Sequence, residues 1–136
     1  MTASRASSLD ATTLTLERGL LGFEPFTAFT LAPIPEAPPF GLLASVEASD
    51  LGFIVVSVAD AVPDFTPTIP TWLTTRLEQA GVQHVEMLLL VTVDASGAAS
   101  VNLRAPLVLW EGRQYGVQVV LDEALPLRHA LPSGQG

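Results

Sequence analysis

The chain contains no cysteine in its 136 residues. This absence excludes disulfide bonds, thiol catalysis and cysteine-ligated metal, and it is compatible with any redox compartment. Histidine is nearly as scarce, because His84 and His129 are the only two and neither has a second histidine at ligand spacing. A zinc site is therefore not predicted, and we expect no cofactor.

Lysine is also absent, so the six basic residues are all arginine, against 14 acidic residues and a formal net charge of -8. Proteins bind the nucleic-acid backbone mainly through clustered cations, so we predict no direct nucleic-acid partner. Two interpretations of the acidic excess stay open. It keeps an apolar chain in solution, or it steers a basic protein partner toward the chain.

Long hydrophobic runs are missing too, although 49% of the residues are hydrophobic. The longest uncharged apolar stretches, 51–59 and 87–93, are far shorter than the ~18 residues that indicate a membrane span. The first residues lack the apolar segment of a secretory signal. We therefore predict a cytoplasmic protein with no membrane partner.

The rest of the chain reads as one domain over residues 12–131, with a disordered lead-in over 1–11 and a flexible tail over 132–136. Strand patterns predict elements at 12–16, 26–31, 40–46, 53–58, 85–93, 98–103, 106–110 and 115–121. One helix is predicted over 72–80, with Thr71 as N-cap and Gly81 as stop. Its apolar positions predict one face that docks on the sheet, and they are Trp72, Leu73, Leu77 and Ala80. The pattern predicts an all-β class, a compact antiparallel β-barrel or sandwich with one short α-helix.

Two short sequence signatures lie within this pattern of strands. Residues 19–24 read Gly-Leu-Leu-Gly-Phe-Glu, and their glycines predict a tight turn with positive φ. Residues 101–110 read Val-Asn-Leu-Arg-Ala-Pro-Leu-Val-Leu-Trp. Pro106 cannot donate to a central ladder, so two strands are expected to meet at a bend there.

Together these signatures resemble those of the flagellar assembly factor FliW family, which shows an early Gly-Ile-Pro-Gly-Phe-like element and a late Asn-Leu-x-Ala-Pro-like element. The resemblance extends from residue 12 to residue 131 and implies the barrel-like β fold of that family. The chain departs from the family pattern at several positions. Leu20-Leu21 replaces Ile-Pro, Arg104 replaces glutamine, and Trp110 stands where asparagine is frequent.

Catalytic patterns are not found. Asp60 with Asp64, and Asp122 with Glu123, are carboxylate pairs without a nearby nucleophile or oxyanion donor, so we do not expect an enzyme. The candidate protein-binding residues are Phe23, Glu24, Asn102, Arg104, Pro106, Trp110 and Asp122.

Two of these candidates also have a local interpretation. The Arg104 guanidinium could bind carbonyls freed at the bend or a carboxylate such as Glu24, and Asn102 could satisfy backbone groups there. In the functional interpretation, these residues shape a surface that a partner's tail contacts.

The resemblance implies a non-catalytic protein-binding regulator. Such a protein binds the RNA-binding translational regulator CsrA and relieves its repression of flagellin translation, with flagellin as the competing partner. The alternatives are a small-ligand-binding β-barrel, whose apolar excess lines a cavity, and a FliW-fold protein with a different client.

Overall fold

A computed structural model describes residues 12–121 and 124–131 of the chain. Its strands are β1 (Thr12–Glu17), β2 (Ala28–Pro33), β3 (Gly41–Ser45), β4 (Gly52–Ser57), β5 (Glu86–Val93), β6 (Ala99–Val101), β7 (Leu107–Trp110), β8 (Tyr115–Gln118) and β9 (His129–Ala130). Its helices are α2 (Val58–Ala61) and α3 (Thr71–Gln79). The predicted β class is confirmed. The predicted lead-in and tail lie outside the described residues, and the domain limits stay a prediction.

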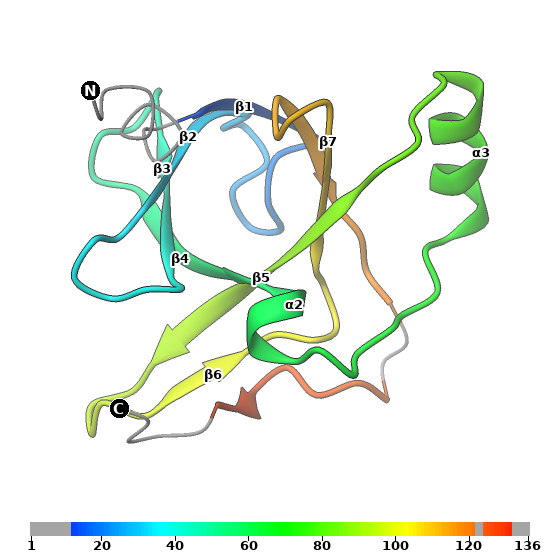
Figure 1. The fold of residues 1–136 in the computed structure, drawn as a ribbon. Coiled ribbons are helices and arrows are strands. Elements are labelled where there is room, and N and C mark those ends of the chain that lie inside the picture. The colour runs from blue at the N-terminus through cyan, green and yellow to red at the C-terminus, as the bar shows by residue number, and fades with distance from the viewer. Residues whose placement is uncertain (1–11, 122–123, 132–136) are drawn as a thin grey trace, which may run out of the picture.

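Seven strands form a closed ring in the order β4, β3, β2, β1, β8, β7 and β5, and β5 returns to β4 (Figure 1). Antiparallel neighbours alternate in direction, so a ring with an odd number of strands must contain a parallel pair. That pair is β1 with β8, in register from Thr15 opposite Tyr115 to Glu17 opposite Val117. The predicted barrel is confirmed, and this parallel pairing departs from the antiparallel arrangement that was predicted for it.

The strand β5 is longer than its neighbours and pairs with two strands along one of its edges. Its first residues, Glu86 to Leu88, pair with β7, and its last, Val91 to Val93, pair with β6. The chain passes from β6 to β7 through the bend that Pro106 predicts. The short strand β9, which the sequence analysis missed because two residues carry no periodicity, pairs with β6 outside the ring.

Alternation along the strands divides the apolar side chains between the inside and the outside of the ring. The four residues of β7 illustrate this, because all are buried. Leu107 and Leu109 join the interior core, whereas Val108 and Trp110 pack on the outer face. The buried interior cluster consists of Leu14, Leu16, Leu20, Phe29, Leu31, Leu43, Val55, Leu88, Leu107 and Leu109. The ring is therefore filled by side chains over most of its length.

The helix α3 covers the outer face of β7 and β8 through Leu73 and Leu77, which lie one turn apart. Burying each leucine contributes ~2 kcal/mol. After the helix, Gly81 adopts φ +75, and the Val82 N–H donates to the Leu77 carbonyl at 2.9 Å. This 6→1 bond, with Val82 packed in the same cluster as Leu77, is a Schellman ending that confirms Gly81 as the stop.

The start of α3 differs from the prediction. Pro70 occupies the N-cap position without a side-chain hydrogen bond, and Thr71 is the first helical residue. Trp72 precedes Leu73 by one residue and so lies about 100° around the helix from it, off the face that docks on the barrel, and its side chain is 43% exposed. The predicted docking face is confirmed for Leu73 and Leu77, whereas the expectations that Thr71 caps the helix and that Trp72 belongs to this face are wrong.

A second helix, α2, directly follows β4. The Ser57 hydroxyl accepts the Asp60 N–H at 3.1 Å and donates to the Asp60 carboxylate at 2.9 Å, which is a compact N-terminal cap. The Ser-x-x-Asp signal is present in the sequence. A helix of four residues has no apolar periodicity of its own, however, so the expectation of a single helix is wrong.

Candidate partner-binding site

The strand register gives the ring two ends, which differ in how they are covered. The end formed by the C-terminal residues of β1, β3 and β8 and the N-terminal residues of β2 and β4 is here named the closed end. The opposite end, where β1 and β3 begin and β2 and β4 finish, is named the open end. The segment between β1 and β2 lies across the ring in Figure 1 and seals the closed end.

Apolar side chains of this segment act as the seal. Leu20 is 1% exposed and belongs to the interior core, and Phe26 packs against the same core. The Phe23 ring meets the Phe53 ring edge to face, with centroids 5.2 Å apart. Such pairs stabilise by about 1 kcal/mol beyond the area that they bury.

The first signature shapes the backbone of the seal. Gly19 has φ +62, and a Cβ there would lie 2.7 Å from the Glu24 carbonyl oxygen. Gly22 has φ +87, but a Cβ there would meet nothing within 4 Å. Gly19 is therefore required for both its conformation and its lack of a side chain, whereas Gly22 is required for its conformation alone.

The second signature forms the bend between β6 and β7. The Asn102 side-chain oxygen accepts the N–H groups of Arg104 at 2.9 Å and Ala105 at 3.2 Å. The Arg104 Nε–H donates to the Leu125 carbonyl at 3.1 Å. The local interpretation is thus confirmed for Asn102, whereas the carbonyl that the Arg104 Nε–H contacts belongs to Leu125 and lies outside the bend. The Glu24 carboxylate accepts the Gly22 N–H at 3.2 Å.

One side chain that the sequence analysis missed joins the two signatures. The Gln118 side-chain oxygen accepts the Leu21 N–H at 2.8 Å, and its Nε2 donates to the Ala105 carbonyl at 3.1 Å. The only signal in the sequence is a lone amide within the apolar stretch 116–121. Because both of its partners are backbone groups in distant segments, Gln118 fixes the position of the exposed turn relative to the bend.

The six predicted binding residues that the structure describes fall into three groups by their exposure. Phe23 and Glu24 are exposed at the closed end, beside Leu21, which is 58% exposed. Asn102 and Arg104 are half-buried at the bend, whereas Pro106 and Trp110 are buried. Asp122 lies outside the described residues. The assignment of all seven residues to a partner surface stays a prediction.

The two tryptophans differ in their exposure to solvent. Trp110 is 8% exposed, and the Arg76 guanidinium of α3 lies 6.0 Å from its ring centroid. Arg76 also pairs with Glu17 of β1, and this hydrogen bond raises the pKa of Arg76. Trp72 is the exposed tryptophan, with the Arg18 guanidinium 4.9 Å from its ring. A partner can reach Trp72 directly, whereas Trp110 lies beneath α3.

The described part of the chain holds no group of three or more histidine, aspartate or glutamate side chains that could coordinate a metal ion. Among residues 12–121 and 124–131, no helix is long and apolar enough to cross a membrane.

Comparison with known proteins identifies the family. A sequence model described as FliW protein matches residues 3–131. The flagellar assembly factor FliW of Clostridium botulinum is 31% identical over 120 residues, which cover 87% of this chain and 85% of that protein. FliW of Thermotoga neapolitana is 35% identical over 121 residues, which cover 85% and 79%. A crystal structure of the flagellar assembly factor FliW matches with a TM-score of 0.75 and 27% identity, over 91% of this chain and 88% of that one. The chain belongs to the FliW family of flagellar assembly factors.

Proposed function

We propose that this chain is a non-catalytic regulator that binds a CsrA-type RNA-binding protein and relieves its repression of flagellin translation. Flagellin competes for the same factor, so free flagellin releases the repressor and lowers its own synthesis. The regulator acts in the cytoplasm, where translation takes place. Family membership supports this proposal, because the relatives are named as flagellar assembly factors and not as enzymes.

The observation that carries the proposal is the exposed turn at the closed end. Leu21 presents an apolar side chain that is 58% exposed, next to the Phe23 ring and the Glu24 carboxylate. Gln118 and the backbone bond from the Phe23 N–H to the Leu20 carbonyl, 2.7 Å, hold this turn in place. A preorganised apolar anchor loses little conformational entropy on binding, which is the property of an effective interface centre.

Charge complementarity favours the same class of partner. An RNA-binding regulator needs clustered cations to hold a phosphate backbone, whereas this chain has a formal net charge of -8. Opposite charges speed association and disfavour wrong partners more than they tighten the final complex. The apolar turn would therefore supply affinity and the acidic surface would supply selectivity.

The test is isothermal titration of the CsrA-type regulator and of flagellin, both from the organism that encodes this chain, into wild type and Leu21→Ser. Loss of the anchor should weaken binding by about tenfold. The matched control is Leu42→Ser, since Leu42 is a leucine 43% exposed on the outer wall of β3, and it should bind as wild type does. Failure of both proteins to bind the wild type, or equal affinity of the two variants, contradicts the proposal.

A further inference from the structure

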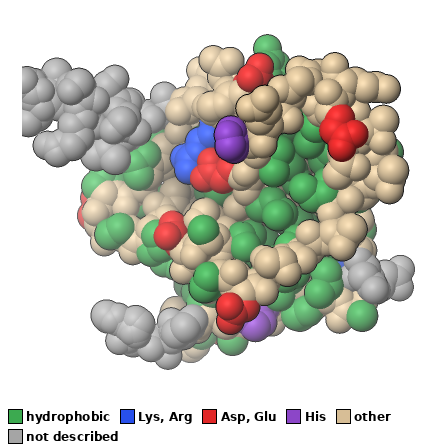
Figure 2. Space-filling model, turned by 45° about the vertical axis from the view of Figure 1, so that its right-hand side comes forward, with side chains coloured by type: hydrophobic (Ala, Val, Ile, Leu, Met, Phe, Trp, Pro, Cys, Tyr) green, Lys and Arg blue, Asp and Glu red, His purple; other side chains and the backbone are tan. Residues whose placement is uncertain are grey.

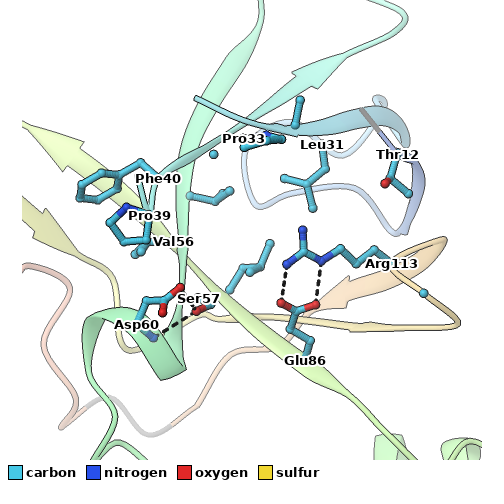
Figure 3. A pocket seen from close by; sticks show the side chains of 15 residues that line it. Thr12, Leu31, Pro33, Pro39, Phe40, Val56, Ser57, Asp60, Glu86 and Arg113 are labelled. Carbon is cyan, nitrogen blue, oxygen red and sulfur yellow. Dashed lines mark hydrogen bonds and ion pairs between the residues drawn. The ribbon is translucent and has the colours of Figure 1, made fainter. Parts of the chain in front are cut away.

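The open end of the ring holds a pocket of about 600 Å³ that the proposed function does not use. Figure 3 shows side chains arranged around this space, with Leu31 and Pro33 across from Asp60 and Glu86. Its floor is apolar, because Leu31, Val55 and Leu88 reach it from the interior core. The volume lies in the range of protein sites that enclose a small group.

Three charged side chains line the pocket, and their balance decides what it can hold. Arg113 donates from Nε and Nη2 to the two Glu86 carboxylate oxygens, at 2.7 Å and 2.6 Å. This bidentate pair neutralises itself, and its hydrogen bond raises the pKa of Arg113. Asp60 is the third charged group, and within the described residues its carboxylate accepts a hydrogen bond from the Ser57 hydroxyl alone. Two carboxylates against one guanidinium leave the lining with one net negative charge.

An apolar floor under a single uncompensated carboxylate suits a cation on an apolar stem. Arginine and lysine side chains have this form, since they bury their methylene groups while the charged head stays at a polar rim. A planar guanidinium can form two parallel hydrogen bonds with the two oxygens of a carboxylate, a fixed geometry that an ammonium lacks. Phe40, which also lines the pocket, adds an aromatic ring of the kind that attracts such cations.

We propose that the open-end pocket receives an arginine side chain from a protein partner, with its guanidinium on Asp60 and its stem over Leu31, Val55 and Leu88. The inference rests on the proposed function in one respect, namely that the partner is the basic regulator. It adds a second contact, at the opposite end of the ring from the exposed turn.

The direct test uses methyl NMR of the full chain and the probe Nα-acetyl-arginine methylamide. The expected result is concentration-dependent shifts in the methyl signals of Leu31, Val55 and Leu88. The matched probe is the citrulline analogue, which has nearly the same shape and no charge, and it should leave these signals in place. Absence of shifts with the arginine probe, or equal shifts with both probes, overturns the proposal.

Two substitutions in the pocket should change the affinity for the arginine probe in opposite directions. Asp60→Asn should weaken the probe about fivefold, the upper end for an accessible ion pair, because the asparagine keeps hydrogen-bonding groups for Ser57 but not the charge. Arg113→Gln should strengthen binding, because it leaves Glu86 uncompensated. A purely structural role for the pocket would not give opposite effects for these two changes. The control Asp50→Asn removes the same charge in the β3–β4 loop, at the closed end, and should leave binding unchanged.

The same variants, titrated with the regulator, separate the two proposals. A regulator that binds wild type and Asp60→Asn equally overturns the pocket assignment and leaves the proposed function standing. A regulator that fails to bind, while the arginine probe still shifts the pocket methyls, contradicts the proposed function alone. Equal weakening by Asp50→Asn and Asp60→Asn indicates general charge attraction and also overturns the pocket assignment.

Discussion

The two ends of the ring are built from the same strands but end differently. At the closed end, Leu20, Phe23 and Phe26 fold back over the core. At the open end, β1 and β8 stay paired only from Thr15 onward, so the first residues of β1 have no partner in β8. The turn after β7 fills part of the gap with the Arg113–Glu86 pair, and a pocket of about 600 Å³ remains. An odd number of strands requires one parallel pair, and here that pair is short. The open end of the ring is therefore left uncovered.

The space-filling view adds a third surface to this comparison. With the α3 side brought forward, hydrophobic side chains gather in a hollow on the molecule (Figure 2). Partly buried hydrophobic residues around the α3 cluster are Ile69, Val82, Met87 and Leu121. Apolar packing supports α3, whereas the turn at the closed end is held by hydrogen bonds, among them the one that the Leu21 N–H donates to the Gln118 side chain.

The largest expected difference between the ends comes from truncating a leucine at each. Leu20 at the closed end is 1% exposed, and Leu31 at the open end is 4% exposed. We expect Leu20→Ala to lower the free energy of unfolding by about 4 kcal/mol and Leu31→Ala by about 2 kcal/mol, because the second space merges with an existing pocket and leaves no new sealed cavity. Urea unfolding of both variants measures this. Equal losses would show that the open end is packed as tightly as the closed end.

A second prediction tests how the seal is built. Gly19→Ala should lower the free energy of unfolding by about 3 kcal/mol, because it adds a backbone clash to the left-handed conformation. Gly22→Ala should cost about 1 kcal/mol, because only the conformation is unfavourable there. Chemical unfolding, with the Leu21 amide followed by hydrogen exchange, distinguishes local opening of the turn from global loss. Indistinguishable variants would mean that the turn relaxes without disturbing the core.

The smallest expected effect lies in the β5–β6 hairpin, which belongs to neither end and serves as a reference. The Ser96 hydroxyl, followed by the N–H groups of Ala98 and Ser96, lowers the pKa of the Asp94 carboxyl. A folded-state pKa below the unfolded value gives stability that is complete above the unfolded pKa and is lost as pH falls through the folded one. Ser96→Ala should therefore raise the pKa of Asp94 and leave both ends unchanged. A carboxyl NMR titration checks the first point, and an unaltered pKa would contradict it.

Local patterns in the sequence were sufficient for the strands β1 to β8 and for the two signatures. In 107–110 the alternation of side chains is hidden, because both faces are buried, yet Pro106 and the aromatic end marked the strand limits. The glycines of 19–24 predicted the tight turn because the left-handed conformation strongly favours glycine over other residues.

Long-range relations could not be predicted in the same way. Nothing near Thr15 indicates that it pairs in parallel with Tyr115. Gln118 was missed because its partners are backbone groups, which have no sequence signature. Leu73 and Leu77 dock as their spacing indicates, whereas Trp72 was misplaced because its apolar character was given more weight than its angular position on the helix. The pocket depends on where the β1–β8 pairing stops, which is a property of the whole ring.

The pairing of β1 with β8 also bears on how the chain is made. Thr15 and Tyr115 are 100 positions apart, so a ribosome has produced most of the protein before the first strand can meet its final neighbour. Until then one side of β1 is an uncovered template that can capture strands from other nascent chains. Closure over so long a loop is also intrinsically slow. A protein proposed to time the synthesis of another would thus itself acquire its working shape only at the end of its own translation.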